Sequence, residues 1–383
     1  MSEIISFSIP ADIIFGIDSL MKLGDVIHSK GNKAIIITEP MFYDNKLIGQ
    51  IEQLLKSFNI DYIIYDEINA DSGSEDISNI AILAQTARVD VIIGLGGQKC
   101  LNIAKAVGLI APHEKSFYYY LKHPEELDEK IPVILLPTTI RDYFALSDMI
   151  YYKDQDIGYS RIFTHPKLYS DYVIIDPILS ADIPKNIMTL MLIEMLGFAI
   201  DSVLSPKSSI FTDTLLFKTI ETINSNFDHI LEFPDDLEVR KNICLGGLFL
   251  MFAGRITGFG LLQTLVLGLN SYLKIPKLSI VMPVLPHILE FLVQSAPEKF
   301  VKIANCLNLD TKNGSVVESA LKVPEYFQIM ADTHKIPSRL SEFGVVKEVL
   351  YKLADHSINF PFYSNTLKVI SKEDIYNILY SSL

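Results

Sequence analysis

The first half of the chain alternates short aliphatic runs with stretches in which apolar residues recur at helical spacing. The aliphatic runs predict strands at 33–38, 61–68, 89–95, 131–139 and 172–179. The stretches between them predict helices at 45–59, 77–88 and 100–110. Unbroken Ile/Val/Leu runs are typical of strands buried on both faces. Their alternation with helices predicts an α/β fold with a doubly wound parallel sheet.

The pattern changes after the last of these strands. From Pro184 onward nearly every segment has helical periodicity. The helices predicted there cover 184–204, 209–231, 237–254, 257–273 and 283–295, with several more before Leu383. We place the domain boundary near 178–183. Residues 1–180 are then an α/β domain, and residues 181–383 an all-helical domain.

Composition and charge narrow the function classes. Hydrophobic residues make up 49% of the 383 residues and charged residues 21%, a balance typical of globular domains. The net charge of −13, without any Lys/Arg run, argues against a nucleic-acid or membrane surface. The N-terminus lacks a signal-peptide pattern. The most apolar region, 243–269, is interrupted by Arg255 and Gln263, which favours a buried helix pair over a membrane span. We therefore expect a cytoplasmic protein.

A glycine turn joins the strand at 89–95 to the helix at 100–110. Gly96 and Gly97 let the chain turn tightly, and the helix N-terminus behind them favours a phosphate group. Gln98 and Lys99 stand where such loops usually carry small residues. The same glycines could serve turn geometry alone. The Lys99 ammonium could reach a pyrophosphate or point into solvent.

Two further strands are expected to end at the same edge of the parallel sheet as the glycine turn. Glu39, after Thr38, could accept hydrogen bonds from a ribose diol and would repel a 2′-phosphate; it could equally be a helix N-terminal carboxylate. Thr138 and Thr139 end the strand at 131–139, where open α/β sheets bind ligands, and could instead form a turn that bonds its own backbone. Residues 1–180 are thus a candidate nucleotide-binding domain.

These landmarks together resemble the iron-type (group III) alcohol dehydrogenases, the superfamily that also contains glycerol dehydrogenase. The resemblance extends over nearly the whole chain. The matching segments are 13–27, 35–42, 89–106, 131–139, 165–179, 336–345 and 365–379. It implies NAD(P)-dependent oxidation or reduction of small alcohols or aldehydes. The nicotinamide cofactor would lie on the α/β domain. A divalent metal in the helical domain would polarise the substrate oxygen.

The resemblance also implies which positions would hold the metal. The family uses one Asp and three His residues, and alignment places Glu194, Phe198, Gln263 and Lys277 at these positions. None of the four keeps its family residue. The eight histidines contain no i, i+4 pair that could replace them. We identify the chain as a divergent member lacking the metal ligands, and we expect no bound metal.

The resemblance also implies which residues would bind the cofactor. Three of them depart from the family, since Gln98, Lys99 and Asn102 replace Gly, Ser and Asp. Bulky residues at 140–146 also replace the family's small polar run after the Thr pair. We therefore expect weak NAD binding at most, and weaker NADP binding because of Glu39. The candidate cofactor-binding residues are Glu39, Gly96, Gly97, Gln98, Lys99, Asn102, Thr138 and Thr139.

Three hypotheses for the function remain. One is a metal-independent dehydrogenase in which the Lys277 ammonium is the electrophile for the substrate oxygen. The second is a non-catalytic relative that binds or assembles. The third, a metal enzyme with relocated ligands, is the poorest. We expect a small molecule or nucleotide in the interdomain cleft, a homodimer by resemblance, and a Glu194–Lys277 ion pair that Gln263 and Phe198 complete.

Overall fold

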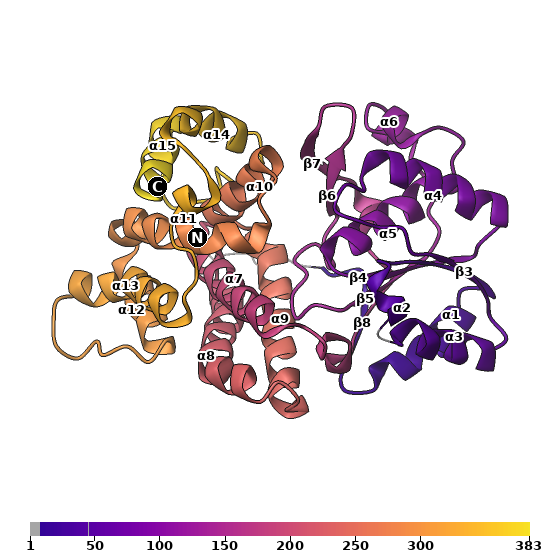
Figure 1. The fold of residues 1–383 in the computed structure, drawn as a ribbon, viewed down its shortest axis with the longest axis horizontal. Coiled ribbons are helices and arrows are strands. Elements are labelled where there is room, and N and C mark those ends of the chain that lie inside the picture. The colour runs from indigo at the N-terminus through magenta and orange to yellow at the C-terminus, as the bar shows by residue number, and fades with distance from the viewer. Residues whose placement is uncertain (1–7, 45) are drawn as a thin grey trace, which may run out of the picture. The chain divides into compact units, whose positions relative to one another are not determined.

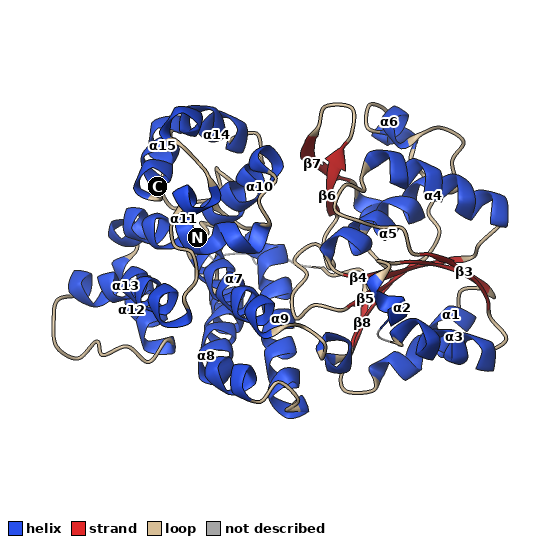
Figure 2. Cartoon of the chain, in the orientation of Figure 1, coloured by secondary structure: helices blue, strands red, loops and turns tan. Residues whose placement is uncertain are grey.

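The computed structural model describes residues 8–44 and 46–383 (Figures 1 and 2). Residues 1–7, where the sequence shows no signal peptide, and Asn45, the predicted start of a helix, lie outside the described residues. The chain divides into two compact units between Ile183 and Pro184. We call them the α/β unit and the helical unit. The boundary expected from the sequence lay between residues 180 and 181.

The α/β unit is built on a six-stranded sheet in which every pairing is parallel. The strand order is β1-β8-β5-β4-β2-β3. The strands are β1 (Asp12–Phe15), β2 (Lys33–Ile37), β3 (Asp61–Tyr65), β4 (Val91–Gly96), β5 (Val133–Pro137) and β8 (Tyr172–Ile175). The central strands β2, β4 and β5 are almost wholly buried, as their unbroken aliphatic sequences require. The predicted parallel sheet is confirmed.

Helices cover both faces of this sheet (Figure 2). The helices are α1 (Leu23–His28), α2 (Met41–Asp44), α3 (Leu47–Ser57), α4 (Ser74–Ala87), α5 (Gln98–Ile110) and α6 (Phe117–Tyr120). Apolar residues of α1 and α3 pack on one face, against side chains such as Ile36, Ile93 and Leu136. Helix α5 packs on the other face against β4 and β5, and all its residues from Cys100 to Ile110 are buried. Parallel strands need such crossover helices, which explains the doubly wound arrangement.

A small antiparallel hairpin was not predicted from the sequence. It consists of β6 (Met149–Asp154) and β7 (Tyr159–Thr164), and it forms a separate two-stranded sheet. β6 alternates buried and partly buried residues and packs against α5. The unit also contains 3-10 helices at Ser19–Lys22, Pro124–Glu126, Pro166–Leu168 and Pro177–Ser180.

Residues 184–383, which make up the described part of the helical unit, contain no strand. Its helices are α7 (Lys185–Val203), α8 (Ile210–Glu232), α9 (Leu237–Thr257), α10 (Leu261–Leu273), α11 (Lys277–Leu292), α12 (Pro297–Cys306), α13 (Val316–His334), α14 (Leu350–Ser357) and α15 (Lys372–Ser381). Its 3-10 helices are Val293–Ser295, Leu340–Phe343 and Lys347–Val349. The all-helical second half is confirmed.

One predicted helix start in this unit is wrong. The helical periodicity of the sequence placed a helix at 283–295. Helix α11 instead begins at Lys277 and contains Pro283 and Pro286. Nearly all its residues from Ile280 to Leu289 are buried, so packing offsets the backbone hydrogen bonds that proline cannot make.

Two helices of this unit are long and apolar enough to cross a membrane by length and composition. They cover Lys185–Val203 and Lys277–Ser295, and 83% and 61% of their apolar windows are buried inside the protein. Helices α9 and α10 meet at 98°, and form the helix pair expected from the apolar region 243–269. Burial of this extent is what core helices of a large helical unit require.

Candidate functional site

The carboxyl ends of β2, β4 and β5 lie side by side at one edge of the sheet in the α/β unit. β4 pairs with both β2 and β5, and the Thr138 amide donates to the Gly96 carbonyl over 3.1 Å. The chain leaves β2 toward β3 and leaves β4 toward β5, so the strand order diverges between β2 and β4. Open α/β sheets bind their ligands at such a point. The structure therefore brings the predicted strand ends together.

The glycine turn at this edge requires glycine at one position. Gly96 has φ of +140°, and a Cβ there would lie 3.1 Å from Cys100 Sγ. The turn leads through Gly97 directly into α5, whose first residue is Gln98. A Cβ at Gly97 would lie 3.8 Å from Thr139 Cγ2, so the ends of β4 and β5 are in contact range here. The backbone geometry of a phosphate-binding turn is thus present.

Glu39 lies beside this turn. A Cβ at Gly96 would be 3.5 Å from Glu39 Oε2. Burial raises the pKa of the Glu39 carboxyl, and the Lys99 ammonium partly offsets this rise. Glu39 and Lys99 are therefore close enough to interact electrostatically, and the carboxylate stands at the end of β2 where a ribose would be read.

Lys99 adopts a third arrangement, different from the two considered from the sequence. Its Nζ donates to the carbonyl of Asn69 over 3.0 Å and also to the carbonyl of Ala70. Burial lowers the pKa of this ammonium, and Lys153 lowers it further. The side chain thus ties the first turn of α5 to the loop that follows β3.

The remaining predicted cofactor residues bond within the unit. Asn102 is buried, and its Nδ2 donates to the Tyr151 carbonyl of the hairpin over 3.0 Å. Its Oδ1 is buried without a hydrogen-bond partner among the described residues. Thr139 Oγ1 donates to the Arg141 carbonyl over 2.6 Å. The alternative that the Thr pair forms a turn bonding its own backbone therefore holds for Thr139.

A buried lysine that the sequence reasoning missed anchors the segment after this turn. Lys105 Nζ donates to the carbonyls of Phe144, Ser147 and Met149 over 2.7, 2.7 and 2.8 Å. Burial lowers the pKa of Lys105 to about 7. Three carbonyls match the three protons of an ammonium. The available signal was a single charge within the otherwise apolar run 103–110 of α5.

The bulky residues of 140–146 lie in the same segment. Arg141, Tyr143 and Phe144 are 7%, 5% and 1% exposed, and the Arg141 guanidinium lies 5.7 Å from the centre of the Tyr143 ring. Their side chains are thus largely buried within the protein.

The four family ligand positions lie on three helices of the helical unit that pack on one another. Glu194 and Phe198 are on α7, Gln263 is on α10, and Lys277 is the first residue of α11. Helix α7 contacts α10 and α11, which also contact each other. The close approach occurs at Gly197, where a Cβ would be 2.9 Å from Leu262 and 3.1 Å from Leu285.

Three of these four side chains are buried. Glu194, Phe198 and Gln263 are 2%, 1% and 1% exposed, and Lys277 is half-buried. The Phe198 ring packs on Phe259 with ring centres 5.5 Å apart. Gln263 Oε1 is buried without a hydrogen-bond partner among the described residues. The Glu194–Lys277 ion pair stays a prediction.

A second residue that the sequence reasoning missed fixes the start of α10. Asp201 on α7 is buried, and its carboxylate accepts from the amides of Gly260, Leu262 and Gln263 over 2.7, 3.4 and 3.5 Å. Burial raises the pKa of Asp201 to about 6, and these amides oppose the rise. Asn365 holds the preceding turn by donating to the carbonyls of Thr257 and Phe259. Gln263 is therefore placed by a rigid turn.

The donor chemistry of this centre does not fit the family's metal. Phe198 has no donor atom, and Lys277 binds metal only after losing a proton. Glu194 and Gln263 leave two protein ligands, fewer than the three or four that a transition metal needs. The orphaned Gln263 oxygen is an uncharged amide acceptor where the family has an imidazole.

One group elsewhere places three metal-binding side chains together. Among residues 8–44 and 46–383, His123, Glu125 and Glu126 have ligand atoms within 4.8 Å of one another. All three are on the surface of the α/β unit, and the two carboxylates are exposed. Tyr119 donates to Glu126 over 2.8 Å, so part of this group is already engaged. It is not at the family's ligand positions.

Comparison with known proteins covers both units. Residues 10–177 match the family described as iron-containing alcohol dehydrogenase, and residues 187–383 match the C-terminal domain of the Fe-containing alcohol dehydrogenase family. The chain is 21% identical to choline dehydrogenase of Bacillus subtilis over 365 residues, 94% of this chain and 90% of that protein. It is 23% identical to long-chain-alcohol dehydrogenase 1 of Geobacillus thermodenitrificans over 327 residues, 85% of this chain and 82% of that protein.

Solved structures agree on the fold. The structure of 1,3-propanediol oxidoreductase superposes with a TM-score of 0.93 at 17% identity, covering 100% of both chains. An alcohol dehydrogenase from Oenococcus oeni gives 0.91 at 19% identity, covering 99% of this chain and 100% of that chain. The family match extends from residue 10 to residue 383 with one short gap. On this evidence the chain belongs to the iron-containing alcohol dehydrogenase family.

Proposed function

We propose that this chain is a member of the iron-containing alcohol dehydrogenase family that has lost the metal-dependent reaction and retains a weak nucleotide site. The observation that carries the proposal is the set of side chains at the four ligand positions. Only two of the four can ligate without losing a proton, and one of those, Gln263, is an uncharged amide. Metal-assisted polarisation is worth several kcal/mol of transition-state stabilisation, so its loss removes most of the family's catalytic power.

The nucleotide part of the proposal is supported by the sheet edge. Gly96 and Gly97 keep the turn that presents backbone amides to a phosphate, and Glu39 stands beside it. The side chain of Lys99 is bonded to the loop after β3, so it is not available to a pyrophosphate without breaking these bonds. NAD is the cofactor that fits, with weak affinity, because a carboxylate at Glu39 repels the 2′-phosphate of NADP.

Titration of the purified chain with NAD and NADP tests this part. We expect weak binding of NAD and weaker binding of NADP. In Glu39→Ala, the ratio of the NADP dissociation constant to the NAD dissociation constant should fall about tenfold. The variant removes the repulsion between the Glu39 carboxylate and the 2′-phosphate of NADP. Glu67→Ala, an exposed acid after β3, is the matched control and should change neither. Micromolar NADP binding by the unmodified chain would contradict the role of Glu39, and tight NAD binding would contradict weak cofactor retention.

An activity assay tests the catalytic part. The named relatives act on alcohols such as choline and long-chain alcohols, so aldehyde reduction with NADH is the relevant reaction. We expect no turnover above background and no stimulation by added Fe²⁺ or Zn²⁺. Turnover that rises with either metal would contradict the proposal.

A metal-independent dehydrogenase is the second candidate. It is supported by Lys277, a half-buried cation at the first position of α11, on the helix that packs against the helices of Glu194 and Gln263. An ammonium near a developing alkoxide lowers its energy. Metal-free turnover that Lys277→Met abolishes, while Lys274→Met retains it, would establish this candidate. Absence of turnover excludes it.

The remaining features of the proposal follow from composition and family. We infer a small-molecule or nucleotide ligand, a homodimer and a cytoplasmic location. The net charge of −13 disfavours nucleic acid and anionic membranes as partners.

A further inference from the structure

Lys99 is a cation in the first turn of α5, where the helix dipole favours negative charge. This turn contains no acidic residue, and no side chain caps the helix. The Lys99 amide has no hydrogen-bond partner among residues 8–44 and 46–383. The start of α5 therefore combines an unused amide donor with an ammonium at a helix end that is already positive.

The Lys99 ammonium is held by the loop that follows β3. It donates to the carbonyls of Asn69 and Ala70, which uses two of its three protons. The third proton has no partner in the part of the chain that the structure describes. Lys105 differs, since three carbonyls take all three of its protons. Lys99 can therefore bond a further acceptor.

The carbonyls that hold Lys99 belong to an exposed loop. We call residues 69–71 the β3 loop, and all three are exposed. The Asp71 amide donates to Asn69 Oδ1 over 2.9 Å. The Ser72 amide donates to the Asn69 carbonyl over 3.3 Å, and this carbonyl also accepts from Lys99. Release of Lys99 therefore loosens the backbone around Asn69.

The charge of Lys99 acts at the glycine turn. Burial raises the pKa of the Glu39 carboxyl and of the Cys100 thiol, and the Lys99 ammonium opposes both rises. Glu39 Oε2 and Cys100 Sγ lie 3.5 and 3.1 Å from the point that a Cβ at Gly96 would occupy. A phosphate bonded to the Lys99 amide would lie next to the residue that carries the ammonium. A lysine that follows a glycine loop, at the start of the next helix, reaches phosphate groups in this way.

We propose that Lys99 couples phosphate binding at the glycine turn to release of the β3 loop, because the phosphate and the loop compete for one ammonium. The inference rests on the proposed nucleotide site and adds how that site responds to its ligand. A charge-assisted hydrogen bond to a phosphate oxygen is about twice as strong as one between neutral groups, so the phosphate takes Lys99 from the carbonyls. Breaking the two carbonyl bonds lowers the apparent affinity, which contributes to the weak NAD binding proposed above.

Hydrogen exchange of the full chain, read by mass spectrometry, tests the proposal. The probes are pyrophosphate and NAD, each at a concentration that calorimetry shows to be saturating. We expect either probe to speed exchange in the segment 69–73 at least about threefold, because the Asp71 and Ser72 amides both bond Asn69 in the ligand-free chain.

The two probes separate this inference from the proposed function. Faster exchange with pyrophosphate, without any NAD binding, would contradict the proposed nucleotide site and leave the role of Lys99 standing. NAD binding with unchanged or slower exchange in 69–73 would overturn the inference and leave the nucleotide site standing. Failure of both probes to bind would overturn both.

Variants assign the coupling to Lys99. Lys99→Met should speed exchange of the β3 loop without ligand, abolish the response to pyrophosphate and weaken its binding about fivefold. Lys153→Met is the matched control. Lys153 Nζ lies 2.6 Å from Asp71 Oδ1, so this variant loosens the same loop from the hairpin side and keeps Lys99. Its response to pyrophosphate should persist. A response that also persists in Lys99→Met would overturn the inference.

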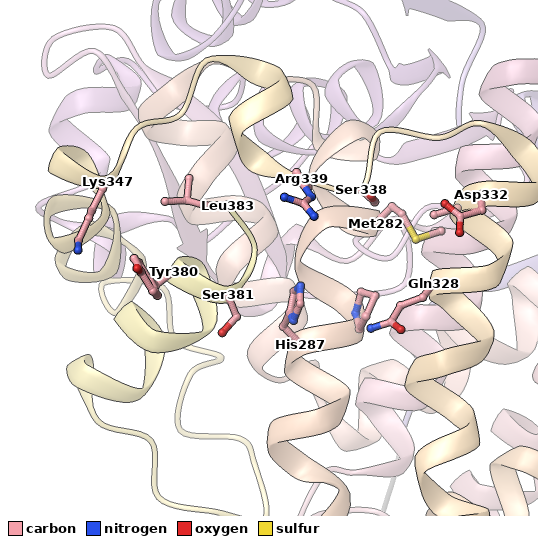
Figure 3. A pocket seen from close by; sticks show the side chains of 12 residues that line it. Met282, His287, Gln328, Asp332, Ser338, Arg339, Lys347, Tyr380, Ser381 and Leu383 are labelled. Atoms are coloured by element: carbon pink, nitrogen blue, oxygen red, sulfur yellow. The ribbon is translucent and has the colours of Figure 1, made fainter.

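A second control addresses pyrophosphate binding to the helical unit. Arg339 and Lys347 are exposed cations at a hollow of about 560 Å³, which Figure 3 shows. Arg339→Gln and Lys347→Gln leave the glycine turn unchanged, so each should retain the full exchange response of the β3 loop. Loss of this response in either variant, with an intact melting temperature, would overturn the inference.

Discussion

Two sites can be compared: the sheet edge at Gly96 in the α/β unit, which we call the glycine edge, and the junction of helices α7, α10 and α11. They differ in whether backbone or side chains define the site. At the glycine edge the site is made by backbone: Gly96 has a φ that disfavours side chains, and the Thr138 amide bonds the Gly96 carbonyl. At the helix junction the family site is made by four side chains. The comparison teaches that a scaffold can keep its backbone-defined site while a side-chain-defined site loses its chemistry.

Both regions use a buried ion to hold a turn. Lys105 binds three carbonyls after β5, and Asp201 binds three amides at the start of α10. Lys105 and Asp201 thus hold the backbone next to the two sites, and neither is one of the candidate cofactor-binding or metal-binding residues. The scaffold of each site therefore does not depend on the residues that would bind cofactor or metal.

The largest expected effect is on the α/β unit. Lys105→Ala should lower the free energy of unfolding by about 4 kcal/mol at pH 6, because it removes three hydrogen bonds that an ammonium donates to carbonyls inside the unit. The Phe144 and Met149 carbonyls keep Ser147 as a donor. Urea unfolding measures the change, and Lys115→Ala, an exposed lysine, is the control. A loss below about 1 kcal/mol would show that solvent reaches these carbonyls and that the segment is not anchored as described.

In the helical unit, the contribution of Asp201 to the free energy of unfolding should depend on pH. The folded-state pKa of Asp201 is about 6, above its ordinary value of 3.8, so its ionisation costs the folded state about 3 kcal/mol. The contribution is fully present below pH 3.8 and is lost as pH rises through 6. Relative to Asp201→Asn, the unmodified chain should therefore lose up to about 3 kcal/mol of unfolding free energy between pH 4 and 7.5.

Urea unfolding of both proteins across this range gives the difference directly. Asp182→Asn, at an exposed position, controls for general titration. A difference that is constant with pH would mean that Asp201 stays ionised throughout, held by the α10 amides.

A smaller effect is expected from the Glu194–Lys277 pair. Removing one partner of a fully buried pair costs about 3–5 kcal/mol, and the half-burial of Lys277 reduces our expectation for Lys277→Ala to about 2 kcal/mol. The double variant Glu194→Leu/Lys277→Met should cost less than the sum of its single variants. Strict additivity in this double-mutant cycle would rule out the pair.

The sequence predicted the fold where local pattern decides it. The aliphatic runs gave β2 to β5 within two or three residues at each end, and the second half was correctly helical. The hairpin was missed, since β6 and β7 pair across a turn and pack on α5, which no local pattern reveals. The start of α11 was missed because burial overrides the preference of Pro283.

For the candidate sites, the sequence could predict where residues lie in the fold, but it could not predict their hydrogen-bond partners. Glu39 and Gly96 could be placed at one edge because both follow strands of a predicted parallel sheet. The partners of Lys99, Lys105 and Asp201 lie 29 to 62 residues away in sequence, so only the folded chain identifies them. Buried ions in apolar helices were the available signal, without any indication of what they bind.

Metal content of the purified chain tests the central claim most directly, namely that the helical junction no longer holds a metal. Elemental analysis after purification in buffer containing Fe²⁺ and Zn²⁺, followed by desalting, should find below about 0.1 metal per chain. The variant Glu194→Asp, Phe198→His, Gln263→His and Lys277→His restores the family donors on the same helices and should retain about one. About one tightly bound iron or zinc in the unmodified chain would contradict the account.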